Sequence, residues 1–147
     1  MAATTEQLLE HKSPGRYFSP WQVLVGTILG GPMAGGYLIA SDHSAFGAAG
    51  RGRATLVISC LVIVGGVALQ SALGDRFNPA DGSVVAGLVA GCYGVYARVA
   101  LTGEIARRGG LGWLPHSWLR VLGISLGFLA AMLLLVALAA PQLGTAP

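Results

Sequence analysis

Titratable and nucleophilic side chains are scarce in this sequence, and few of them stand where they could share chemistry. Asp42 and His43 are adjacent and are of types that move protons or bind metal ions. Adjacent side chains on a helix point in different directions, however, and no third ligand is evident near this pair. Cys60 and Cys92 belong to neither a Cys-x-x-Cys pair nor a Cys/His cluster. We therefore expect no metal site, no redox pair and no cofactor.

Arg98 is the one charged residue inside an apolar segment, and Tyr93 and Tyr96 lie just before it in the chain. Its side chain can extend to the lipid headgroups, or it can contact an anion or a partner with help from the tyrosines. Arg107 and Arg108 follow an acidic residue at the spacings of ion pairs on a solvated helix face. The candidate anion or partner contacts are Tyr93, Tyr96, Arg98, Arg107 and Arg108.

The sequence contains none of the local motifs of common enzyme classes. A nucleophile elbow, a phosphate-binding loop, a His-Glu-x-x-His helix and a paired-carboxylate signature are absent. General acid–base catalysis needs positioned titratable groups, and no acidic side chain lies deep in an apolar segment. We therefore predict that the protein is not an enzyme.

The composition excludes several broad classes of protein. Charged residues make up 10% of the 147 residues, apolar residues make up 54%, and the mean hydropathy is +0.67. A water-soluble domain carries about 25% charged residues, so this chain has too few to cover its surface. Its 9 Lys and Arg residues are spread over short segments and form no dense basic face. The composition predicts an integral membrane protein whose partner is the lipid bilayer, with no nucleic-acid partner.

Four apolar segments organise the chain. Each is close to the roughly 20 residues that a helix needs to cross a hydrocarbon core, and none alternates like a strand of a membrane barrel. The sequence therefore predicts an all-α integral membrane four-helix bundle in a single domain over 19–141. The expected helices span about 20–41, 54–74, 83–101 and 118–140, and the expected polar tails span 1–18 and 142–147.

The first apolar segment has a marked start and an interrupted middle. Ser19 and Pro20 begin a Ser-Pro-x-Gln capping box with proline at the first helical position. Gly30, Gly31 and Pro32 lie at the midpoint, where proline removes a backbone N–H and glycine loosens the helix. The segment therefore either spans the membrane as a broken or kinked helix, or returns to the face it entered from as a re-entrant hairpin.

The basic residues orient the chain in the membrane. If all segments span, the loops at 42–53 and 102–117, with the helix edges beside them, share one face and hold 6 of the 9 basic residues. The positive-inside rule places that face in the cytoplasm and both termini outside. A re-entrant first segment adds the N-terminal tail to the cytoplasmic face, which then holds 8 of the 9. Both arrangements predict that those two loops lie in the cytoplasm and that the C-terminus lies outside.

Small residues recur at the four-residue spacing that brings membrane helices close together. This pattern predicts a tight bundle that forms a homo-oligomer or contacts another membrane protein, and the lining of a narrow solute pathway is the alternative. The candidate packing or pore residues are Gly30, Gly31, Pro32, Gly35, Gly87, Gly91, Gly94, Gly123 and Gly127.

One stretch resembles the opening of a group of small bacterial polytopic inner-membrane proteins of unknown activity. The shared residues fall in the first third of the chain, at Tyr17–Pro20, Gln22–Val23, Gly30–Gly35 and Tyr37–Leu38. The resemblance implies an integral membrane location and no particular activity. Small multidrug transporters are similar in size and helix number, but they depend on a glutamate inside the first helix, which this chain lacks.

Together these patterns favour a non-enzymatic inner-membrane protein that acts through helix–helix contacts, as an accessory, assembly or toxin-immunity component. The alternative is a small oligomeric channel or transporter. It would use the broken first segment to present backbone carbonyl and N–H groups to a solute.

Overall fold

Four long helices and two very short strands make up the computed structural model, which describes residues 15–73 and 79–143. In chain order the elements are β1 (Arg16–Tyr17), α2 (Pro20–Ala45), α3 (Ala49–Leu73), α4 (Pro79–Gly109), β2 (Leu114–Pro115) and α5 (Trp118–Leu143). Each of the four helices contains a stretch that is long and apolar enough to cross a membrane. The predicted all-α membrane bundle is confirmed.

The helices run further than the sequence suggests. α2 continues to Ala45 and α3 begins at Ala49, so most of the predicted loop 42–53 is helical. α4 continues to Gly109, which leaves only the second half of the predicted loop 102–117 without helix. A charge-free stretch marks the hydrocarbon core, whereas a helix can extend into the headgroup region and beyond it.

α5 passes the predicted helix end at residue 140 and stops at Leu143. Of the two predicted tails, residues 1–14 and 144–147 lie outside the described residues. The beginning of the first helix is as predicted. Ser19 and Gln22 form the capping box, with each side chain bonded to the other residue's backbone N–H, and Pro20 is the first helical residue.

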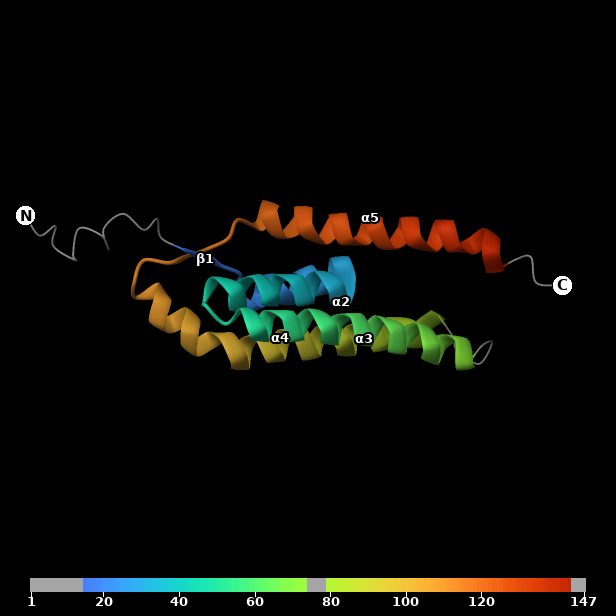
Figure 1. Cartoon of the computed structure of the whole chain (residues 1–147), viewed down its shortest axis with the longest axis horizontal. Helices are drawn as coiled ribbons and strands as arrows, with labels where there is room; N and C mark the ends of the chain where they lie inside the picture. Colours follow the sequence, from blue (N-terminus) through green and yellow to red (C-terminus); the bar gives the residue numbers. More distant parts are fainter. Residues whose placement is uncertain (1–14, 74–78, 144–147) are drawn as a thin grey trace, which may run out of the picture.

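α2 consists of two half-helices that fold back on each other. Gly31 separates them with φ 73° and ψ −174°, a conformation open essentially to glycine alone, and Pro32 begins the return. A Cβ added at Gly26 would lie 2.5 Å from the Leu38 side chain. In a continuous helix these two residues would be about 18 Å apart along the axis. α2 therefore forms a hairpin, as Figure 1 shows.

Both ends of this hairpin lie at one end of the bundle. The Phe18 N–H donates to Asp42 Oδ1 at 2.8 Å, which joins the start of α2 to its last turns. Beside them the His116 N–H donates to the Tyr17 carbonyl at 2.8 Å, where β1 and β2 pair in parallel. We call this end, with Phe18, Asp42 and His116, the base, and the opposite end, where α3 stops at Leu73, the far end.

The first apolar segment is therefore a hairpin, as the re-entrant alternative expects, and not one kinked helix, and the hairpin shares the base with three long helices. α3, α4 and α5 each pack against α2 and make few contacts with one another. α5 lies on one side of α2, and α3 and α4 lie on the other (Figure 1). The core sits around the hairpin and consists of Phe18, Val23, Leu38, Ile39, Tyr93, Ala97, Leu101 and Val121.

The hairpin is shorter than the helices around it. α3 has 25 residues, whereas α2 divides its 26 residues between two antiparallel halves. The far halves of α3, α4 and α5 therefore extend past the tip of the hairpin (Figure 1). Their large apolar side chains, such as Val64, Leu88 and Leu133, are exposed there. Exposed apolar side chains on helices of this length are suited to a lipid or protein environment.

Candidate functional site at the re-entrant hairpin

The hairpin tip is where the backbone loses its regular helical partners. The first half-helix ends at Gly30 and the second begins after Gly31. The last carbonyls of the first half and the first N–H groups of the second half therefore have no partner within their own helix. Hydrocarbon offers no hydrogen bond, so such a break is tolerated inside a membrane only against protein or water. The tip is thus the point of the fold whose backbone groups most need protein or water beside them.

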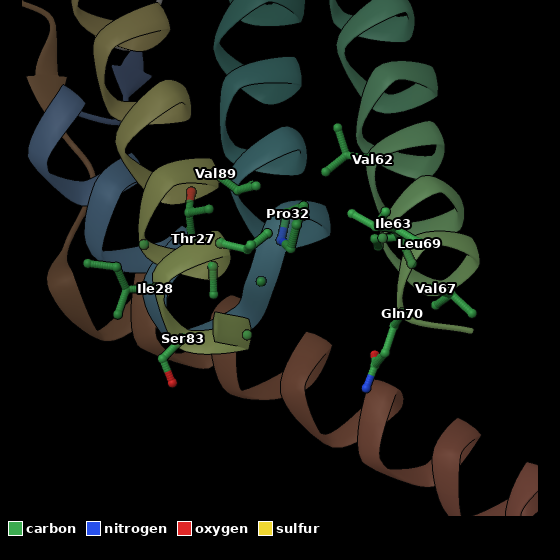
Figure 2. A pocket seen from close by; sticks show the side chains of 16 residues that line it. Thr27, Ile28, Pro32, Val62, Ile63, Val67, Leu69, Gln70, Ser83 and Val89 are labelled. Atoms are coloured by element: carbon green, nitrogen blue, oxygen red, sulfur yellow. The ribbon is translucent and has the colours of Figure 1, made fainter. Parts of the chain in front are cut away.

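A cavity of about 640 Å³ adjoins the tip, between α3 and α4. Figure 2 shows Pro32 projecting toward it, with Val62 on α3 and Val89 on α4 as its walls. The lining is mostly apolar, and it includes the polar side chains of Gln70 and Ser83. Several lining side chains are themselves exposed, so the cavity is open to the surroundings of the chain.

Glycines permit the close approaches that hold the hairpin together. A Cβ added at Gly30 would lie 2.6 Å from the Ser125 carbonyl oxygen and 2.8 Å from its Cα, both on the backbone of α5. A Cβ at Gly35 would clash with the Thr27 side chain across the hairpin and approach the Tyr93 ring at 3.1 Å. Of the predicted packing positions, these two therefore lie inside the bundle, where larger residues do not fit.

The remaining predicted glycines divide into two groups. Gly94 of α4 belongs to the interior group, because an added Cβ would contact the Leu24 side chain at 3.1 Å. The second group has nothing within 4 Å of an added Cβ and consists of Gly31, Gly87, Gly91, Gly123 and Gly127. The four-residue spacing on α4 and α5 therefore marks outward faces rather than contacts within the described chain, and on α4 Gly87 also borders the cavity at the tip.

Asp42 is the buried carboxyl group of the base. It is 1% exposed, its Oδ1 accepts the Phe18 N–H, and its Oδ2 has no hydrogen-bond partner among the described residues. The sequence shows Asp42 only as an acid at the end of an apolar segment. Its contact with a residue 24 positions away joins the two ends of the hairpin.

The structure separates Arg98 from the two tyrosines that were predicted to assist it. The Tyr93 hydroxyl lies 2.6 Å from Ser59 Oγ on α3, and the Tyr96 hydroxyl lies 3.4 Å from His43 Nε2 on α2. Arg98 lines a groove on another face of α4, next to the first half of α2. The tyrosines therefore connect helices, and neither of their hydroxyl groups assists Arg98. In the described part of the chain no three His, Cys, Asp or Glu residues gather as metal ligands.

The two neighbouring arginines at the end of α4 differ in role. The Arg108 guanidinium packs against the rings of both Phe46 and Trp113, at 4.8 and 4.7 Å from their centroids, and these two rings also contact each other, with centroids 5.8 Å apart. Its Nη2 donates to the Phe46 carbonyl at 2.9 Å. Its Nε also donates to Glu104 Oε2 at 3.3 Å. Among the described residues Arg107 pairs with the same carboxylate alone, at 2.7 Å, and its side chain is 67% exposed. Arg108 therefore joins two connections at the base: the one between α2 and α3, which holds Phe46, and the one between α4 and α5, which holds Trp113.

His116 completes the base. Its ring centroid lies 4.3 Å from that of Phe18, and its carbonyl accepts a hydrogen bond of 2.6 Å from Gln22 Nε2. Burial, and then the positive charges of Arg120 and Arg16, lower the pKa of His116 below its usual value. The imidazole is therefore neutral at pH 7, which suits a ring packed against another aromatic ring.

No family model, curated protein or solved structure matches this chain. Its function must therefore be inferred from the geometry alone. The four apolar helices indicate a multi-pass membrane protein, and α2 forms a hairpin whose tip adjoins an open cavity.

Proposed function

We propose that this chain is a non-enzymatic membrane protein that works by binding other membrane helices, as an accessory or assembly component. One observation carries the proposal: the broken backbone at Gly31 adjoins a cavity that the described chain leaves open. A helix from a second copy or from another membrane protein would cover that break, as a hydrocarbon environment requires.

The outward glycine faces support the same function. Gly87 on α4 and Gly127 on α5 have nothing within 4 Å of an added Cβ, so another helix backbone can approach them closely. α3, α4 and α5 also make few contacts with one another, which leaves much of each helix surface available. Toxin immunity, which needs tight contact with a membrane partner, falls within this class of function.

The orientation that we propose places the base in the cytoplasm of a bacterial cell. Arg51, Arg53, Arg107 and Arg108 lie on the helix ends at the base, and the positive-inside rule assigns such an end to the cytoplasm. Fusions to the two termini test this. A hairpin plus three crossings puts a fluorescent reporter at the N-terminus inside and an alkaline phosphatase at the C-terminus outside. Four crossings would put both on one side.

In-membrane cross-linking tests the contact function. Cys60 and Cys92 are first replaced with alanine, and single cysteines are then placed at Gly87 or Gly127 and treated with a bismaleimide of matching reach. We expect an adduct whose mass identifies a second copy or another protein. Leu88 and Leu126, each one residue along the same helix and exposed, are the matched control positions. Equal or absent cross-linking at all four positions would refute the proposal.

The cavity at the tip favours a second candidate, a small oligomeric channel or transporter. The broken backbone could offer carbonyl and N–H groups to a solute, as broken helices do in transporters. In that case Gly31→Ala with Pro32→Leu should abolish saturable flux into liposomes that contain the protein. Contact function predicts no saturable flux in the wild-type protein, so the flux assay separates the two candidates.

A further inference from the structure

A second groove, of about 510 Å³, lies near the base between the first half of α2 and α4. Leu24 and Val95 form apolar walls, and Gly91 and Gly94 form the floor. An added Cβ at Gly94 would touch Leu24, whereas one at Gly91 would meet nothing within 4 Å. The groove is therefore closed where the two helices touch and open over Gly91.

The end of the groove nearest the base is basic and aromatic. Arg98 lines it there together with Trp21, which is 68% exposed, and Thr102 and Ile105 continue the lining of the groove toward the base. Gly94 contacts Leu24, and Arg98 lies about 6 Å further toward the base, at the level where α2 begins. An exposed indole at this level is typical of the headgroup region of a bilayer.

The positive charge of Arg98 is not neutralised within the described chain. Asp42 is buried against the Phe18 N–H, and Glu104 is shared by Arg107 and Arg108. Other arginines lie at the same end of the bundle, which adds to the positive potential there: Arg16, Arg51, Arg53 and Arg120.

We propose that this groove binds one anionic phospholipid from the leaflet at the base. The phosphate pairs with the Arg98 guanidinium, whose planar donors suit a phosphate, and Trp21 lies beside the headgroup. An acyl chain follows the groove over Gly91, between Leu24 and Val95. A free phosphate would satisfy Arg98 alone and would leave the apolar part of the groove unfilled, so the continuous groove favours a lipid.

Native mass spectrometry of the purified protein with added phosphatidylglycerol or phosphatidylcholine tests this site. We expect wild-type protein to retain one phosphatidylglycerol, and Arg98→Gln to weaken that retention about tenfold. Arg107→Gln is the matched control, because it removes the same charge from the same helix outside the groove. Thermal unfolding in phosphatidylcholine alone verifies that the variants fold.

Gly91→Leu provides an independent variant, because it fills the groove without removing a charge. It should reduce retention of phosphatidylglycerol as strongly as Arg98→Gln, whereas Gly127→Leu should not. Three results would overturn the proposal: equal retention of the two lipids, equal losses in Arg98→Gln and Arg107→Gln, or displacement of the lipid by millimolar inorganic phosphate. Dissociation of a dimer by Gly91→Leu would also overturn it, because a second copy would then occupy the groove.

Discussion

The base and the far end of this bundle pack the same helices in different ways. At the base, hydrogen bonds cross between segments that are distant in sequence, such as Phe18 to Asp42 and Gln22 to the His116 carbonyl. Beyond the hairpin tip, α3 and α4 are instead separated by an apolar cavity. Polar contacts between helices fix one arrangement, whereas apolar surfaces in lipid have no strong preference among partners.

This difference indicates that the two ends of the bundle have different roles. The base holds the hairpin in place, because hydrogen bonds there join its two ends to each other, its start to the segment before α5, and its end to α4. The far end presents apolar helix surfaces and the open side of the cavity to whatever surrounds the chain. Substitutions at the base should therefore change the stability of the chain itself, and substitutions on outward faces should change mainly its associations.

Gly30 lies where the hairpin packs most closely against α5, and its substitution should have the largest effect on stability. Gly30→Leu should destabilise the chain by about 3 kcal/mol, because the side chain would meet the α5 backbone at Ser125, which cannot move aside as a side chain can. Gly127→Leu, on an outward face, should leave the unfolding free energy the same or slightly higher. Thermal unfolding in detergent, followed by tryptophan fluorescence, measures both. Equal losses would show that the outward faces are packed as tightly as the hairpin.

Part of this architecture is visible in the sequence because it depends on local chemistry. The apolar segments, the cap at Ser19 and the break at Gly31 follow from composition and from residues a few positions apart. The direction that the chain takes after the break does not follow from such local features. Gly-Gly-Pro interrupts a helix, but the return toward the base depends on contacts such as Gly26 with Leu38, twelve positions apart.

Glycine spacing shows the same limit. Gly31 and Gly35 share their spacing with Gly123 and Gly127, yet only Gly35 has close neighbours within the bundle. A spacing along one helix identifies a face but not the partner of that face. For a similar reason, the sequence does not predict the role of Arg108. Its helical spacing predicts an exposed ion pair, whereas its packing against the rings of Phe46 and Trp113 depends on two separate connections of the chain.

Asp42 tests the base through a single hydrogen bond. Asp42→Leu should cost about 2 kcal/mol of unfolding free energy, since it leaves the buried Phe18 N–H without an acceptor. Asp42→Asn keeps a carbonyl oxygen for that N–H and should lose much less. The two variants are compared by thermal unfolding and by protease cleavage before Phe18. If asparagine were as damaging as leucine, the negative charge of Asp42, and not this hydrogen bond, would be what the base needs.

Arg108 and Arg107 are neighbours on one turn of α4, but their surroundings at the base differ. Arg108→Ala should lower the unfolding free energy by about 1–2 kcal/mol, because it removes contacts with the rings of Phe46 and Trp113. Arg107→Ala removes only a mostly exposed ion pair and should change stability by less than about 0.5 kcal/mol. Trp113 fluorescence should shift in the Arg108 variant alone. A similar loss in both variants would mean that net charge, rather than packing, holds the connections together.

His116 gives the smallest effect and tests the base through pH. Its folded pKa lies below the usual value of 6.5, so the unfolded chain takes up a proton at a higher pH than the folded chain. The contribution of the neutral ring is therefore complete above about pH 6.5 and is lost as the pH falls through the folded pKa. His116→Gln keeps the backbone carbonyl that Gln22 bonds but cannot titrate. Its stability should consequently depend less on pH between about pH 7.5 and 5 than that of the wild-type protein. If the stability of the two proteins changed equally with pH, a group other than His116 would be responsible for the acid sensitivity of the base.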